Sequence, residues 1–148
     1  MMTEFVLDSF LPYQLAVASS RASRMFSALY RQKYNISVPE WRVVAHLSQA
    51  GAVSVREIHN RVDMDKSKVS RAASRLEASG YVTKRVNKTD RRLVELALTD
   101  KGRSMIDDIA PMARAYEDDA MQSLGDDAGT FRALLKRFLD NTENCDRL

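Results

Sequence analysis

The sequence predicts a mainly α-helical fold with one small β-hairpin, an α+β class, in a single compact unit. Apolar residues recur every three or four positions in several segments, as they do in amphipathic helices. Two short runs near the middle of the chain, 81–86 and 93–98, have the composition of strands, and the second alternates in polarity. The chain has 148 residues, and about 150 residues is a fair prior for one domain.

Three helices are expected in the first part of the chain. The first runs from about Pro12 to Tyr34, and its apolar stripe is wide enough to pack against two bodies, which favours a partner chain as one of them. The next two helices begin at Ser37 and Ser54. Each serine is followed three residues later by a glutamate, which is the capping-box pattern at a helix start.

A helix-turn-helix followed by a hairpin comes next. The segment from Lys66 to Ser79 has one narrow apolar face, and Gly80 stands where a helix C-cap glycine belongs. Together with the short helix before it, this segment forms a helix-turn-helix pattern. A strand at 81–86, a polar tip and a strand at 93–98 then complete a winged helix-turn-helix.

Helices flank this unit on both sides. After Thr99 a long helical region follows, and Pro111 inside it should produce a kink. A break at 124–127 precedes a last amphipathic helix around 131–139. The predicted division is therefore a winged helix-turn-helix at 37–99, with flanking helices at 1–36 and 100–148.

The charge distribution singles out the middle of the chain. Residues 54–92 hold 11 basic and 5 acidic side chains, a net charge of +6, whereas residues 93–148 carry a net charge of −5. A basic block confined to one structural unit suggests a polyanion as partner. The alternative is a solvated charged face, and charge alone does not decide between them.

Several classes of protein fit the sequence poorly. Glycine-rich phosphate loops, nucleophile elbows and Cys/His pairs are absent, so we do not expect an enzyme. His46 and His59 are too few and too far apart in sequence to suggest a metal site, and we expect no cofactor. Cys145 lies in a polar tail, where a thiol switch is not expected. Apolar runs are too short for a transmembrane helix, and the chain start does not read as a secretory signal, so a cytoplasmic location is expected.

Three stretches of the chain resemble the MarR family of bacterial transcription regulators. The resemblance extends from Leu11 to about Leu139 and implies a winged helix-turn-helix whose first and last helices form an intertwined homodimer. It also implies a double-stranded DNA partner with a pseudo-palindromic site, and repression as the default mode of action. The stretches that carry it are 39–47 (PEWRVVAHL), 65–71 with 76–80 (DKSKVSR and LEASG), and 90–92 followed by 96–102 (DRR and LALTDKG).

The resemblance assigns DNA-contacting roles to two elements. On the recognition helix, Arg71 would read base edges, while Ser67 and Ser70 would contact bases or phosphate. The alternative for Ser67 is that it merely caps the helix. At the wing, Arg92 would enter the minor groove, oriented by a salt bridge from Asp90, unless the hairpin is simply mobile and solvated. Phosphate contacts are expected from Lys66, Lys68, Arg75, Lys88 and Arg91.

Family members often release DNA when a small anionic aromatic compound binds between the dimerisation helices and the winged domain. An arginine that pairs with a carboxylate and an aromatic wall would suit such a compound, whether the free acid or its coenzyme A thioester. The alternative is core packing for Trp41 and a surface salt bridge for Arg24. A ligand-independent or architectural DNA-binding protein is the competing functional class. The candidate ligand residues are Tyr13, Ser20, Arg24, Trp41 and His46.

Overall fold

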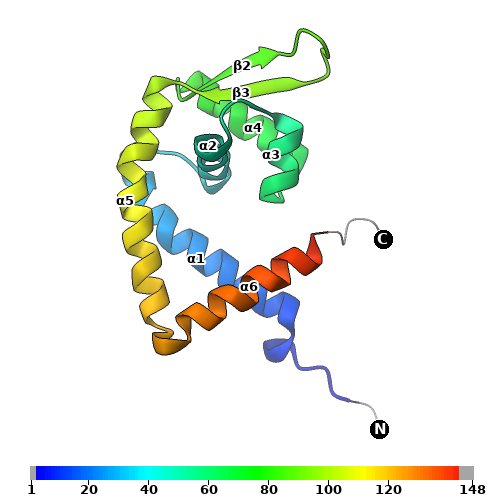
Figure 1. Ribbon diagram of the computed structural model, residues 1–148, viewed down its shortest axis with the longest axis vertical. Helices are drawn as coiled ribbons and strands as arrows, with labels where there is room; N and C mark the ends of the chain where they lie inside the picture. The colour runs from blue at the N-terminus through cyan, green and yellow to red at the C-terminus, as the bar shows by residue number, and fades with distance from the viewer. Residues whose placement is uncertain (1–2, 144–148) are drawn as a thin grey trace. The chain divides into compact units, whose positions relative to one another are not determined.

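The computed structural model describes residues 3–143, which form a mainly helical chain with a small antiparallel sheet (Figure 1). The chain divides into two compact units, Met1–Ala110 and Pro111–Leu148. Helix α5 (Asp100–Gln122) belongs to both units, and the second also contains η2 (Gly125–Asp127) and α6 (Ala128–Thr142). The other elements of the first unit are η1 (Leu7–Ser9), α1 (Leu11–Tyr34), α2 (Val38–Ala50), β1 (Val53–Ser54), α3 (Val55–Val62), α4 (Lys66–Ala78), β2 (Val82–Val86) and β3 (Val94–Leu98).

The sheet has three strands rather than the two that the sequence predicts. Strand β3 lies in the centre and pairs antiparallel with both β2 and β1. In the predicted hairpin, Val82 pairs with Leu98 and Val86 with Val94. Strand β1 is two residues long, which is too short for an alternating pattern to be visible in the sequence.

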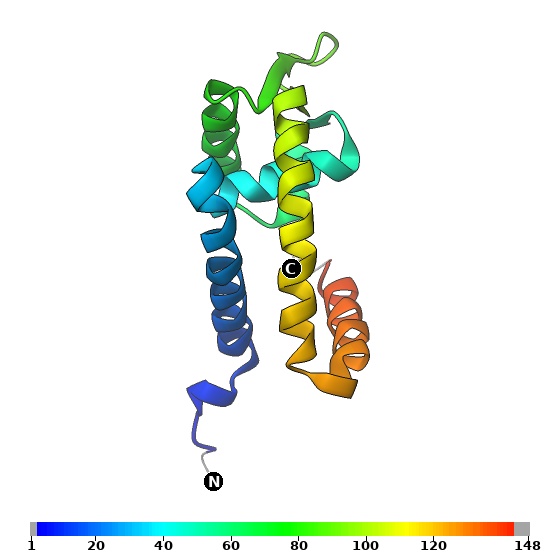
Figure 2. The ribbon, with the colours of Figure 1, turned by 90° about the vertical axis from the view of Figure 1, so that its left-hand side faces the viewer.

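Helix α2 lies at the centre of the first unit. Figure 1 shows α3 and α4 on one side of it and the first part of α5 on the other, and in Figure 2 that part of α5 lies in front of α2. Its start carries the predicted capping box, because Ser37 Oγ accepts from the Glu40 N–H while the Glu40 carboxylate accepts from the Ser37 N–H. At the start of α3 the structure shows the Ser54 half of such a box, a bond from the Glu57 N–H.

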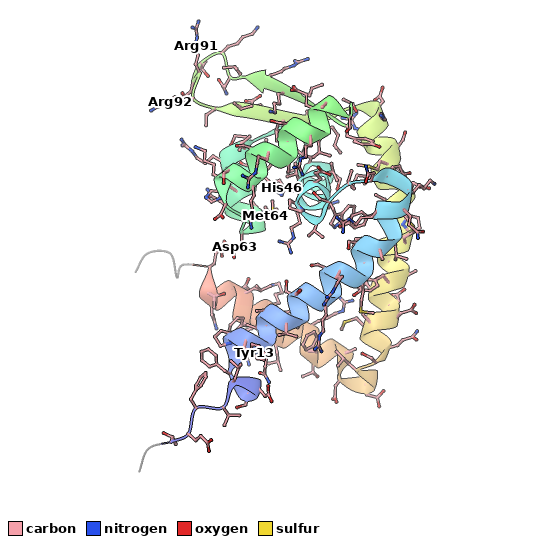
Figure 3. All side chains as sticks on the ribbon, turned by 180° about the vertical axis from the view of Figure 1, so that it is seen from behind. Tyr13, His46, Asp63, Met64, Arg91 and Arg92 are labelled. Atoms are coloured by element: carbon pink, nitrogen blue, oxygen red, sulfur yellow. The ribbon has the colours of Figure 1, made fainter. Side chains whose placement is uncertain are left out.

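The narrow apolar face predicted for the fourth helix is buried. This face packs towards α2 and α3, so the opposite face of α4 must point outward. The turn that delivers α4 contains Asp63, in the left-handed conformation with φ 53°, and Met64 (Figure 3). Nδ1 of His59 hydrogen-bonds the Met64 carbonyl oxygen and closes the turn. The buried face of α4 consists of Val69, Ala72, Ala73 and Leu76.

A tight joint connects the end of α4, the hairpin and the start of α5. Gly80 has φ 82°, which lets the chain turn back so that the Tyr81 N–H reaches the Leu76 carbonyl at 2.9 Å. Thr99 Oγ1 donates to the Gly80 carbonyl (2.6 Å) and accepts from the Gly102 N–H (3.1 Å), which caps α5. The base of the wing is therefore fixed to the helices on both sides.

Helix α5 runs through Pro111 without interruption, and the kink expected at this residue stays a prediction. In the first unit, Asp108 of α5 accepts hydrogen bonds from Lys33 Nζ at 2.6 Å and from the Tyr34 hydroxyl. The Lys33 ammonium and the Tyr34 hydroxyl hold the pKa of Asp108 below its usual value. In the second unit, Arg132 pairs with Glu117, and the predicted break appears as η2.

We predict that Gly102→Ala destabilises the protein. A Cβ at this position would lie 2.2 Å from the Tyr81 carbonyl oxygen, a backbone atom that cannot move aside without opening the joint. Overpacking of this kind costs about 1–3 kcal/mol. Urea unfolding at fixed protein concentration measures the change.

Gly129→Ala is the matched control, because a Cβ there has no atom within 4 Å. Replacing this helical glycine with alanine should raise the free energy of unfolding by about 0.5–1 kcal/mol. Equal unfolding midpoints for Gly102→Ala and the unsubstituted protein would contradict the close approach.

Candidate nucleic-acid interface

The outward face of α4 presents every residue that the sequence assigned to this helix. The helix begins at Lys66 with Asp65 as its N-cap residue, so Ser67 is not the cap. With the apolar face buried, the polar side chains are free to meet a partner. The exposed residues are Lys66, Ser67, Lys68, Ser70, Arg71 and Arg75.

The wing tip is organised by its own side chains. Asn87 Oδ1 accepts from the backbone N–H groups of Thr89 (2.9 Å) and Asp90 (3.2 Å), while its amide donates to Glu95 (2.9 Å). These bonds give the polar tip a defined turn. Figure 3 shows Arg91 and Arg92 at the end of this turn, directed away from the body of the unit.

The salt bridge expected between Asp90 and Arg92 is present. Arg92 Nε lies 3.1 Å from Asp90 Oδ1 and Nη2 lies 3.4 Å from Oδ2, so the contact is bidentate. The Arg92 N–H also donates to Oδ1 at 3.1 Å. The bonds from the Arg92 guanidinium and backbone hold the pKa of Asp90 below its usual value, with a smaller contribution from the charge of Arg56. The Arg92 side chain keeps 85% of its surface exposed and can still reach a partner.

Two pockets with cationic walls lie against α4. The wing-side pocket, about 160 Å³, is lined by four cations, Arg56, Lys66, Lys84 and Arg92, together with Ser70, Ser74 and an apolar floor. The α2-side pocket, about 410 Å³, is lined by Lys68, Arg71 and Arg75 with Ser37, Pro39 and Ala72. No carboxylate of the described residues lines either pocket, so both present positive potential to an anion.

The sequence did not single out Arg56 and Lys84 at this surface. Lys84 Nζ donates to Ser74 Oγ at 2.7 Å, which joins the wing strand to α4. The signal that could have found Lys84 is strand alternation, since Lys84 shares a face of β2 with the buried Val82. Arg56 lies at the start of α3, directly after β1, and reaches the pocket by tertiary packing that a sequence pattern does not place.

Comparison with known proteins identifies the family. The MarR family model matches residues 34–93. The solved MarR family transcriptional regulator SPO1453 from Silicibacter pomeroyi DSS-3 is 30% identical, with a TM-score of 0.77 over 93% of this chain and 98% of its own. The chain belongs to the MarR family. Members of this family are transcription regulators rather than enzymes, which confirms the prediction that the chain is not an enzyme.

Other MarR-type relatives give a consistent assignment. The HTH-type transcriptional regulator TtmR of Methylorubrum extorquens (strain PA1) is 34% identical over 98 residues, which are 64% of this chain and 50% of TtmR. The chain spans about half the length of the curated relatives that it matches. BpsR of Bordetella bronchiseptica, whose DNA binding is regulated by 6-hydroxynicotinic acid, is 20% identical with a TM-score of 0.79 over 93% of this chain and 98% of its own, a likeness of fold.

The five candidate ligand residues of this MarR protein do not meet within one chain. Tyr13, Ser20 and Arg24 are exposed along α1, and Figure 3 shows Tyr13 far from His46. Trp41 and His46 do share a shallow pocket of about 390 Å³, which is also lined by Arg42, Ala45, Arg61 and Val62. The structure thus brings together two of the five residues and adds two arginines to them.

Trp41 also packs against α1. Its ring stacks on Tyr30, with centroids 5.5 Å apart, and meets Phe26 edge-on at 5.2 Å. Burial raises the pKa of Tyr30 to about 12. The buried Nε2 of His46 has no hydrogen-bond partner among the described residues. Core packing therefore accounts for one face of Trp41, while His46 retains an unused polar atom.

Neither a metal-ligand cluster nor a membrane-spanning helix is found among residues 3–143. No three His, Cys, Asp or Glu side chains in this range are grouped to hold a metal ion. No helix in the same range is both long and apolar enough to cross a membrane. Cys145 lies outside the described residues.

We predict that Arg92→Ala raises the pKa of Asp90 toward the ordinary value for an aspartate. A carboxyl-detected NMR titration measures this pKa. Since the folded-state pKa is lowered, the contact is fully formed above the unfolded-state pKa and is lost as pH falls through the folded-state pKa.

Arg91→Ala is the control for the titration, because it removes the same charge from the adjacent residue without removing the Arg92 hydrogen bonds. A comparable rise in both variants would show a general charge effect instead of the bidentate contact.

Proposed function

We propose that this MarR-family protein is a sequence-specific, homodimeric DNA-binding regulator that represses transcription and is released by a small anionic aromatic effector. The observation that carries the proposal is the exposed face of α4, whose short polar residues and arginine lie between two cationic pockets and beside an oriented wing arginine. A DNA partner implies a cytoplasmic location.

The exposed α4 face has the composition that a recognition helix needs. Ser67, Ser70 and Arg71 stand near its N-terminal end, where recognition helices contact base edges in the major groove. Arg92 then lies at a tip that can reach the neighbouring minor groove, which attracts arginine where the groove is narrow. The surrounding cations are phosphate contacts, which position the helix without reading sequence.

The dimer is proposed from apolar surface that each unit leaves uncovered. In the first unit, Phe10, Leu11 and Leu15 are exposed around the start of α1. In the second, α6 has no buried residue and exposes Phe131, Leu134, Leu135, Phe138 and Leu139. Apolar area of this extent marks an interaction surface. A second copy, pairing through 1–36 and 100–148, would cover it and would set two recognition helices about 34 Å apart on a pseudo-palindromic site.

The effector part of the proposal rests on Trp41 and its neighbours. An aromatic wall with Arg42 and Arg61 beside it suits an aromatic carboxylate. BpsR, whose DNA binding is regulated by 6-hydroxynicotinic acid, shows such a compound class acting on a protein of this fold. In a dimer, Tyr13, Ser20 and Arg24 would be available from either chain.

Binding to the duplex beside the protein's own gene tests the function. We expect fluorescence anisotropy to show tight binding to this duplex and weak binding to a shuffled one at about 0.15 M salt. Phenolic acids and their coenzyme A thioesters are then titrated into the bound sample, and one class should release the DNA. Tight binding that no compound reverses would favour a ligand-independent regulator, and equal weak binding to both duplexes would contradict sequence-specific regulation.

Two arginine variants separate positioning from sequence reading. Arg92→Ala should weaken DNA binding by about 1–3 kcal/mol, because a groove contact is lost. Sedimentation of this variant should still show the dimer. Arg71→Ala should relax the preference at one position of each half-site, measured against a panel of single-base substitutions. A uniform loss across the panel would instead make Arg71 a backbone contact.

A further inference from the structure

We infer that the wing-side pocket is a seat for one DNA backbone phosphate, with Lys84 as a phosphate ligand held in place by Ser74 and with Arg56 as a second new ligand. The inference rests on the proposed DNA-binding function and deepens it. It assigns these residues a role that neither the sequence pattern nor the resemblance gave them.

Four separate parts of the first unit bring a cation to this pocket. Arg56 comes from the start of α3, Lys66 from the start of α4, Lys84 from β2 and Arg92 from the wing tip. Like charges repel, so this convergence costs free energy in the isolated protein, a cost that the pairing of Arg92 with Asp90 offsets only in part. An anion that enters the pocket would remove this cost, and a phosphate can accept hydrogen bonds from several donors at once.

Lys84 is already oriented toward the pocket. It lies on the α4-facing side of β2 and is half-buried, whereas most surface lysines are fully solvated. Its Nζ donates to Ser74 Oγ, and Ser74 Oγ in turn donates to the Ser70 carbonyl at 3.0 Å. A lysine ammonium has three donors, so two remain for phosphate oxygens. Because the side chain is ordered beforehand, less conformational entropy is lost on binding.

The size and surroundings of the pocket favour a phosphate over a base or an aromatic ring. At about 160 Å³ it is smaller than the 300–1,000 Å³ of typical small-molecule sites. Its floor includes Val55, Ala73 and Val94, and low-polarity surroundings strengthen the attraction between an anion and the cations at the wall.

The position of the pocket matches the geometry of a major groove. Lys66, Ser70 and Ser74 follow one another at four-residue spacing along one side of α4 and line the wing-side pocket. Lys68, Arg71 and Arg75 line the α2-side pocket on the other side. A helix inserted in a groove has a phosphate backbone along each flank, so the wing-side pocket would hold the strand next to the wing.

The test compares Lys84→Ala with Arg85→Ala. Both changes remove one positive charge from adjacent residues of β2, but Arg85 is on the opposite face of the strand and does not line the pocket. Lys84→Gln is included as a variant closer in size, and circular dichroism with thermal unfolding checks that each variant folds. Affinity is measured from about 50 to 200 mM salt on the native and the shuffled duplex.

We expect the two Lys84 variants to show a flatter salt dependence than Arg85→Ala. A dimer loses two phosphate contacts, so the slope of log K against log salt should become less negative by about 1.8, at about 0.9 per phosphate. Over the measured range, the affinity of the unsubstituted protein would then fall about 12-fold further than that of Lys84→Ala. The loss should be equal for all base sequences, since phosphate contacts carry no sequence information.

Ser74→Ala separates orientation from charge. It removes the bond that holds Lys84 and leaves the ammonium, so we expect weaker binding with an unchanged salt slope. Equal slopes for the Lys84 and Arg85 variants would overturn the phosphate seat. Failure of the unsubstituted protein to prefer its native duplex would overturn the proposed function, and that result is independent of the slope comparison.

Discussion

Burial of one narrow face of α4 is the constraint on which the rest of the proposed interface depends. Val69, Ala72, Ala73 and Leu76 are all buried against the helix-turn-helix core, and their spacing leaves the helix no freedom to rotate. Rotation by one residue would bring charged side chains into the core, two arginines in one direction or Glu77 in the other, at a high cost in desolvation. The apolar face therefore determines which polar side chains are displayed, although none of its members would touch a partner.

Short polar contacts then carry this fixed orientation to the wing. Thr99 joins α5 to the end of α4 at the base of the hairpin, and Asn87 shapes the tip at the other end. Lys84 adds a link halfway along, between β2 and α4. Each contact is modest in energy, because hydrogen bonds exchange with water. Together they connect the wing to α4, which favours a preformed surface for a partner.

Much of this arrangement could be predicted from the sequence because it is local. The start of α2 at Ser37, the buried face of α4, the Gly80 turn and the pairing of Asp90 with Arg92 all depend on residues within a few positions of one another. Strand β1 was missed because its pairing with β3 joins Val53 to Leu96, distant in sequence. Arg56 was missed for the same reason, since the wing-side pocket is assembled by tertiary packing, whereas the alternation of β2 could have placed Lys84 on the inner face of the strand.

The residues proposed for the effector do not form one site within a single chain. The polar side chains proposed for DNA all belong to the first unit, so each chain carries all the residues proposed for one half-site. Tyr13, Ser20 and Arg24 instead lie along a helix whose apolar start is exposed, and they share no pocket with Trp41 and His46. In the proposed dimer, a site that used all five residues would take some of them from the second copy. Its affinity for an effector would then depend on how the two chains are arranged, and the same arrangement sets the spacing of the two recognition helices. A ligand that favours one spacing over another would change DNA affinity without touching α4.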